Sequence, residues 1–160
     1  MCNKFLTAEA VDKLIKKNWR ISFAESCTGG KCCGALVDEP GASAVLDVSF
    51  ITYANEAKIK YLGVSPNAIE EFGVVSEPVA AQMACGAAEN AKSQVGIGIT
   101  GVAGPSGGTA AKPVGMVCFG FYINGSVQTF TKQFGEAETA FVKKAFALFL
   151  KNCANFFKPS

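Results

Sequence analysis

Histidine is absent from all 160 residues of the chain. This absence excludes every Ser-His-Asp or Cys-His catalytic arrangement and every metal site that depends on an imidazole ligand. No metal site is expected. If the protein is a hydrolase, its general base must therefore be a lysine or a carboxylate.

Long apolar runs and runs of positive charge are also missing. No stretch approaches the ~18 apolar residues of a membrane span. The net charge is only +2, so neither a membrane nor a nucleic-acid partner is expected. The segment after Met1 is charged and amphipathic, unlike a signal sequence. Seven cysteines form no Cys-x-x-Cys pair. We therefore predict reduced thiols and a cytoplasmic location.

The remaining composition is that of one globular domain over residues 1–160, with 49% hydrophobic residues. Helical and strand patterns alternate and end in a hairpin around Asn124-Gly125, which predicts an α/β fold in three layers. Its sheet is mixed, with the antiparallel member in the C-terminal hairpin. A helix over 137–157 is apolar nearly all round, which predicts burial between subunits and hence a homo-oligomer. The other predicted elements are helices 7–18, 31–37, 55–62 and 77–92 and strands 20–24, 45–53, 95–100, 114–123 and 127–134.

Ser26 lies in the turn Glu25-Ser26-Cys27-Thr28-Gly29-Gly30, between a strand and a helix. Ligands collect at that edge of open α/β sheets, and free N–H groups at a helix start can bind an oxyanion. Ser26 is thus placed like a nucleophile. The alternative is an ordinary N-cap serine. Cys27 is a second candidate nucleophile, although without an imidazole partner packing is the favoured interpretation.

A base for Ser26 is offered by Tyr53-Ala54-Asn55-Glu56-Ala57-Lys58. With Asn55 as N-cap, Lys58 lies in the first turn of its helix, where the helix dipole and burial lower the pKa of an ammonium group. A neutral lysine near pH 7 is a competent general base. Tyr53 is placed to orient the lysine or the substrate. The alternatives are a solvated surface lysine and a tyrosine at the edge of the core.

Residues 101–113 form a predicted loop that is rich in glycine, with four glycines in residues 101–109. Consecutive N–H groups in such a loop can bind phosphate, and Thr109 and Lys112 add a hydroxyl and a charge. The alternative is a flexible loop without a ligand.

In combination, four stretches resemble the C-terminal domain of the CinA family, the nicotinamide mononucleotide (NMN) amidohydrolases. They cover essentially the whole chain in the family's order. The chain resembles the stand-alone form, since many relatives carry an additional N-terminal domain. The stretches are residues 24–30, 52–58, 73–79 and 101–115.

The resemblance implies a three-layer α/β/α sandwich, like an anticodon-binding domain, with a mixed, mainly parallel five-stranded sheet. It further implies hydrolysis of the carboxamide of NMN to nicotinate mononucleotide and ammonia without a cofactor. Ser26 would be the nucleophile and Lys58 the base, with Tyr53 beside them and Ser43 in support. The residues expected to bind substrate are Thr28, Gly29, Gly30, Ser43, Thr100, Gly101, Gly104, Gly107, Gly108, Thr109 and Lys112.

One departure from the family pattern concerns a Gly-Asp-Arg sequence ahead of the last helix. Here residues 135–139 read Gly-Glu-Ala-Glu-Thr, and no arginine follows Arg20. Lys143 or Lys144 are possible substitutes, although lysine lacks the bidentate geometry of arginine. Two alternatives to NMN hydrolysis therefore stay open. They are a non-catalytic module that binds pyridine nucleotides and an amidase for another small amide.

Overall fold

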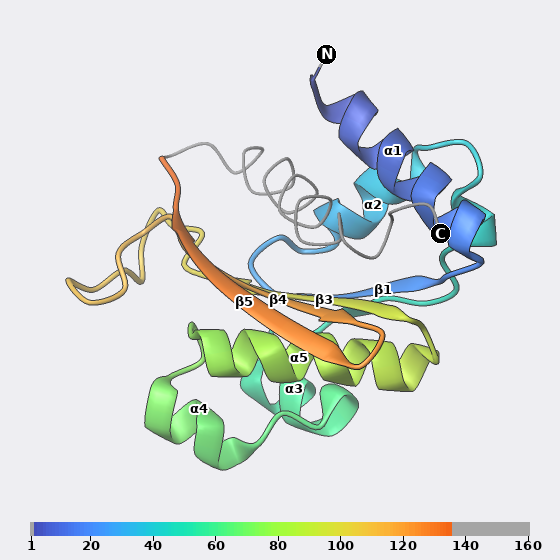
Figure 1. The fold of residues 1–160 in the computed structure, drawn as a ribbon. Coiled ribbons are helices and arrows are strands. Elements are labelled where there is room, and N and C mark those ends of the chain that lie inside the picture. The colour runs from blue at the N-terminus through green and yellow to red at the C-terminus, as the bar shows by residue number, and fades with distance from the viewer. Residues whose placement is uncertain (1, 136–160) are drawn as a thin grey trace.

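A computed structural model describes residues 2–135, which form an α/β domain around one mixed sheet (Figure 1). Within this range the sheet has five strands in the order β2-β1-β3-β4-β5. β1 is parallel to both β2 and β3, whereas β4 is antiparallel to β3 and β5. Only β4 is reversed, so the predicted mixed sheet with its antiparallel member in the hairpin is confirmed. The strands are β1 (Ile21–Glu25), β2 (Phe50–Ile51), β3 (Val95–Gly101), β4 (Met116–Ile123) and β5 (Ser126–Gln133).

Helices cover both faces of this sheet (Figure 1). The alternation of side chains along β1 shows how: Phe23 packs into a core with helices α1 and α2, whereas Ala24 packs with residues of α3 and α5 on the opposite face. The first face carries α1 (Cys2–Lys17) and α2 (Lys31–Val37). The second carries α3 (Asn55–Leu62), α4 (Pro66–Phe72) and α5 (Glu77–Ala91).

Glycines in the central strands allow α5 to approach the sheet closely. A Cβ atom added at Gly98 of β3 or at Gly120 of β4 would lie 2.2 Å from the carbonyl oxygen of Ala80. Such a contact is far shorter than side-chain packing permits. Gly98 and Gly120 therefore serve helix packing.

Two segments differ from the sequence-based prediction. The predicted strand 45–53 is reduced to Phe50–Ile51, because the preceding residues form a turn after a short 3-10 helix, η1 (Ala42–Ala44). There the side chain of Ser49 accepts the N–H of Phe23 at 3.1 Å, which occupies a donor that a longer ladder would use. Helix α4 was not predicted, although Pro66 at its first turn and Gly73 at its end are typical helix boundaries.

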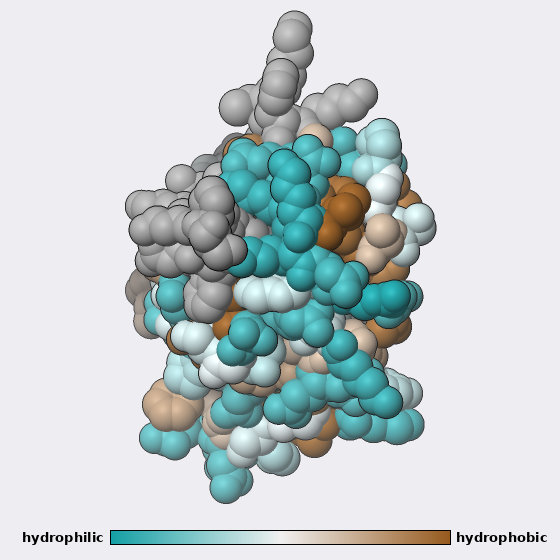
Figure 2. All heavy atoms as spheres, turned by 45° about the vertical axis from the view of Figure 1, so that its right-hand side comes forward, coloured by the Kyte–Doolittle hydropathy of each residue, from teal (hydrophilic) through white to brown (hydrophobic). Residues whose placement is uncertain are grey.

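The hairpin follows the prediction closely. Asn124 and Gly125 have φ angles of 45° and 93°, which are typical of a two-residue turn between antiparallel strands. The predicted helix 137–157 and the departure at 136–139 lie outside the described residues. In the described part of the chain, no helix is both long and apolar enough to cross a membrane. On the side drawn in Figure 2, hydrophilic residues cover most of the described surface and apolar residues form small separate patches.

Candidate active site

Ser26 follows the last residue of β1, at the carboxyl edge of the parallel strands. Its N–H donates to the carbonyl of Ile99 in β3 at 3.1 Å, so the main chain is fixed against the neighbouring strand. The residue is 8% exposed. Its hydroxyl oxygen lies 3.1 Å from Nζ of Lys58. The structure therefore brings together the two residues that were predicted as nucleophile and base.

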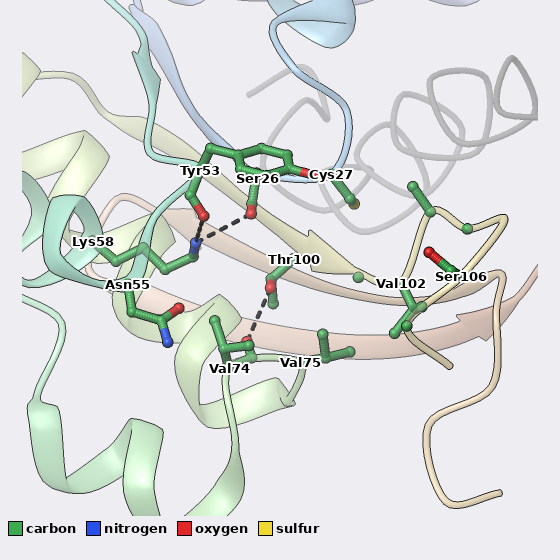
Figure 3. A pocket seen from close by; sticks show the side chains of 14 residues that line it. Ser26, Cys27, Tyr53, Asn55, Lys58, Val74, Val75, Thr100, Val102 and Ser106 are labelled. Atoms are coloured by element: carbon green, nitrogen blue, oxygen red, sulfur yellow. Dashed lines mark hydrogen bonds between the residues drawn. The ribbon is translucent and has the colours of Figure 1, made fainter. Parts of the chain in front are cut away.

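Lys58 comes from the first turn of α3 and is completely buried. Besides Ser26, its Nζ contacts the carbonyl oxygen of Tyr53 at 2.9 Å (Figure 3). It also contacts the carbonyl oxygen of Thr52 at 2.7 Å. A neutral amine has two N–H bonds and one lone pair. Because the two carbonyls can only accept hydrogen bonds, they take both N–H groups, and the lone pair is left for the hydroxyl of Ser26.

Burial lowers the pKa of Lys58 below its usual value of 10.5, against smaller opposing effects from Cys27 and Glu56. Among the described residues, no carboxylate lies within ion-pair distance of Lys58. A buried ammonium without a counter-ion is unfavourable relative to the neutral amine. The environment therefore favours the base form of this lysine.

The surrounding cavity has a volume of about 370 Å³ and opens beside the glycine-rich loop (Figure 3). It brings together several of the predicted site residues from β1, β3, α3 and the loop. These are Ser26, Tyr53, Lys58, Thr100, Gly101, Gly104 and Gly107.

Tyr53 contributes to the site in two separate ways. Its carbonyl orients Lys58, whereas its side chain is 75% exposed and lies at the cavity. The residue is thus not part of the core edge. An exposed aromatic ring beside a cavity is available for stacking against a planar ligand.

Other predicted site residues do not line this cavity. Lys112 donates to the carbonyl of Phe72 at 2.6 Å, and its N–H contacts the hydroxyl of Thr109 at 3.0 Å. These two residues therefore shape the loop. The side of Gly108 is closed by Val114, whose nitrogen would lie 2.8 Å from an added Cβ. Ser43 lines a different cavity beside α2 and η1.

The turn after Ser26 also differs from expectation. Thr28 is buried and does not line the cavity. The N–H of Gly29 donates to the carbonyl of Ser26, and the N–H of Gly30 donates to the carboxylate of Glu25. These two N–H groups are therefore not available to an oxyanion. The N–H groups of Cys27 and Thr28 have no main-chain partner among the described residues.

Some cavity residues were not predicted as part of the site. Asn55 is not the N-cap of α3, since that position is occupied by Ala54, and its side chain lies at the cavity instead (Figure 3). Val74 and Val75 line another wall of the cavity. The hydroxyl of Thr100 donates to the carbonyl of Val74 at 2.9 Å. Ser106 supplies a hydroxyl from the loop. The polarity of Asn55 and Ser106 within the matching stretches was the available signal.

Cys27 lines the same cavity beside Ser26. Desolvation by burial is the main cause that raises the pKa of its thiol to about 12. The thiol is therefore protonated at neutral pH and is a weak nucleophile. No cluster of His, Cys, Asp or Glu suited to a metal ion occurs among residues 2–135.

Comparison with known proteins shows the family of this chain. The family model described as "CinA C-terminal domain" matches residues 3–155. The chain belongs to the CinA family. A relative from Alkaliphilus metalliredigens, named "Putative competence-damage inducible protein", is 53% identical over 116 residues, covering 72% of this chain and 28% of the relative. One from Caldicellulosiruptor saccharolyticus with the same name is 46% identical over 82% of this chain and 32% of its own length. This chain thus spans about 30% of these CinA relatives.

Solved CinA structures match nearly the whole chain. Competence/damage inducible protein CihA from Agrobacterium tumefaciens is 36% identical with a TM-score of 0.90, covering 94% of this chain and 95% of that one. A CinA superfamily protein from Escherichia coli is 37% identical with a TM-score of 0.89, covering 94% and 90%. The α/β fold is therefore that of CinA C-terminal domains.

Proposed function

We propose that this CinA domain is a metal-independent serine/lysine amidohydrolase that cleaves the carboxamide of NMN to nicotinate mononucleotide and ammonia. The observation that carries the proposal is the position of Lys58. It is a fully buried amine 3.1 Å from the hydroxyl of Ser26, with two main-chain carbonyls as its other partners. The resemblance to NMN amidohydrolases supplies the substrate.

In the first half-reaction, neutral Lys58 takes the proton of Ser26 while Oγ attacks the carboxamide carbon. The resulting tetrahedral intermediate collapses when the lysine ammonium returns this proton to the departing nitrogen, which leaves as ammonia. Ser26 is then esterified by the nicotinoyl group. In the second half-reaction, Lys58 activates a water that hydrolyses the ester and regenerates the hydroxyl of Ser26.

The negative charge on the oxygen of the intermediate requires hydrogen-bond donors. Because the N–H groups of Gly29 and Gly30 are already bonded, we assign this role to the N–H group of Cys27, a residue that lines the cavity. On the other side of the cavity, the glycine-rich loop offers main-chain N–H groups and the hydroxyl of Ser106 as further donors. The loop is suited to the phosphate of the substrate, since it offers main-chain N–H groups without requiring a cation.

The pyridine ring of NMN fits the same arrangement. Tyr53 offers an exposed aromatic face at the cavity, and Asn55 offers an amide that can donate and accept hydrogen bonds. Val74 and Val75 provide an apolar wall. A planar aromatic amide is therefore the substrate class that these side chains favour.

Wider features of the proposal rest on the same sequence patterns. Helices on both faces of the sheet support the three-layer α/β/α architecture for the domain over 1–160. The five described free cysteines, Cys27, Cys32, Cys33, Cys85 and Cys118, support reduced thiols and a cytoplasmic location. The apolar pattern of 137–157 supports a homo-oligomer.

A second candidate function follows from the missing Gly-Asp-Arg arginine. Without the bidentate hydrogen bonds of that arginine, the domain would bind pyridine nucleotides without turnover or would hydrolyse another small amide. Purified protein and the Ser26→Ala variant are incubated with NMN, nicotinamide riboside, nicotinamide and several aliphatic amides, and ammonia and the carboxylic acid are quantified. The proposal predicts stoichiometric release of both products from NMN by the wild type alone. Thermal stabilisation by NMN without ammonia release would establish the binding module instead.

A further inference from the structure

We propose that Glu25 is a positioning residue that holds the nucleophile and its base in register, an inference that rests on the proposed function. Glu25 immediately precedes Ser26 and is completely buried at the end of β1. It does not line the cavity. Its effect on Ser26 is therefore exerted through the main chain.

The side chain of Glu25 fixes the turn that carries Ser26. One carboxylate oxygen accepts the N–H of Gly30 at 2.9 Å and that of Cys32 at 3.2 Å, while the other accepts the N–H of Cys33 at 2.7 Å. These three bonds join the residue before the nucleophile to the beginning of α2. The intervening residues 26–29 are thereby closed into a compact loop.

The main chain of Glu25 fixes the base in turn. Its carbonyl oxygen accepts the N–H of Thr52 at 2.8 Å. The carbonyl of Thr52 then accepts a hydrogen bond from Nζ of Lys58 at 2.7 Å. One residue thus connects the loop of Ser26 with a carbonyl that orients Lys58.

The chemistry of these contacts requires a carboxylate. All three side-chain partners are N–H donors, and a carboxylate offers only acceptors. A glutamine at this position directs an NH₂ group toward one of the same donors, so at least one bond is lost and the turn is displaced. A displacement of ~1 Å at a reacting group costs roughly 100-fold in rate.

The test measures how fast Ser26 reacts with a fluorophosphonate, which phosphonylates an activated serine oxygen with loss of fluoride and needs no natural substrate. Wild type, Glu25→Gln and Glu25→Asp are compared by mass spectrometry, together with steady-state ammonia release from NMN. Glu39→Gln is the matched control, because Glu39 is also buried and accepts a bond from Thr7 but lines the other cavity. Ser26→Ala gives the background of labelling.

We expect Glu25→Gln to label and turn over roughly 10- to 100-fold more slowly, with KM for NMN little changed. Glu25→Asp retains the charge on a shorter side chain and should be intermediate, whereas Glu39→Gln should match the wild type at a similar loss in Tm. Hydrogen exchange should be faster at the amides of Gly30, Cys32 and Cys33 in the Glu25 variants, most of all in Glu25→Gln, and unchanged there in Glu39→Gln.

Two failures are distinguishable. A wild type that labels and turns over while the folded Glu25 variants keep its rates overturns the role of Glu25 alone. A wild type that neither labels above the Ser26→Ala background nor releases ammonia from any amide removes the proposed function, and the role of Glu25 with it. If Glu25→Gln does not fold, Glu25→Asp decides by the same rates.

Discussion

Nζ of Lys58 and Oγ of Ser26 lie 3.1 Å apart although 32 residues separate them in the chain. The contact spans two elements: Ser26 follows β1, and Lys58 comes from the helix after β2. β1 and β2 are parallel neighbours, so both segments leave the sheet at the same edge. A parallel strand pair thereby brings a hydroxyl and a buried amine into hydrogen-bond contact.

Activity should rise with pH along a single limb that reports the deprotonation of Lys58. Because burial lowers the pKa of Lys58 from 10.5, the limb should have its midpoint below that value. The measurement is kcat/KM against pH with nicotinamide riboside, which lacks a phosphate that itself titrates near pH ~6. A rate that falls as the pH rises, or a midpoint at 10.5 or above, would contradict a neutral lysine base.

The same lowered pKa predicts how stability depends on pH. Between the folded pKa of Lys58 and the unfolded value of 10.5, the unfolded chain binds more protons, so the free energy of unfolding rises with pH. Below both values the cost of burying the ammonium is fully present. The Tm of the wild type relative to Lys58→Met should therefore increase from pH ~6 to ~10.

Thermal unfolding of both proteins across this range checks the prediction. The raised pKa of Cys27 opposes this trend at high pH in both proteins. The interaction between Cys27 and Lys58 is smaller than the effect of burial on either pKa. Parallel Tm curves would show that Lys58 titrates normally.

Cys27→Ala should retain activity within about threefold, because a thiol with a pKa of about 12 supplies almost no thiolate at neutral pH. Iodoacetamide at pH ~7 should likewise leave the ammonia-releasing activity intact. Turnover with NMN before and after alkylation checks both statements. Loss of activity in Cys27→Ala with Ser26→Ala still active would identify the cysteine as the nucleophile.

Lys112→Met should raise KM without a large change in kcat, since the lysine fastens the glycine-rich loop to the carbonyl of Phe72. Loss of this bond predicts an increase of roughly 2- to 10-fold, for ~0.5–1.5 kcal/mol. The increase should be the same for NMN and nicotinamide riboside. Lys132→Met, on an exposed part of β5, is the control for loss of charge. An increase confined to NMN would mean that Lys112 contacts the phosphate directly.

Local sequence patterns were sufficient to predict the segments that carry Ser26 and Lys58. The turn containing Ser26 and the helix containing Lys58 follow from short patterns of glycine and helix boundaries, and the alternation of elements placed both at one edge of the sheet. By contrast, Ser43 was assigned by family resemblance and Lys112 by its place in the glycine-rich loop. Ser43 lines another cavity, and Lys112 donates to the carbonyl of Phe72 at the end of α4. Both arrangements depend on tertiary packing.

The contacts of Glu25 also depend on tertiary structure and could not be predicted from the sequence. Its position before the nucleophile was evident, but the three N–H groups that it accepts are set by how α2 begins. The short β2 likewise reflects the hydrogen bond from the N–H of Phe23 to the side chain of Ser49. Strand preferences of single residues could not predict this bond. The role of Asn55 changed because Ala54 occupies the N-cap position.

The central claim is tested most directly by ammonia release from NMN in Lys58→Met and Lys58→Arg, with folding checked by circular dichroism. Methionine removes the amine, whereas arginine keeps a positive charge that cannot act as a base near neutral pH. We predict that both folded variants lose at least about 100-fold in kcat, the usual contribution of a general base. Near wild-type turnover in either variant would contradict the account.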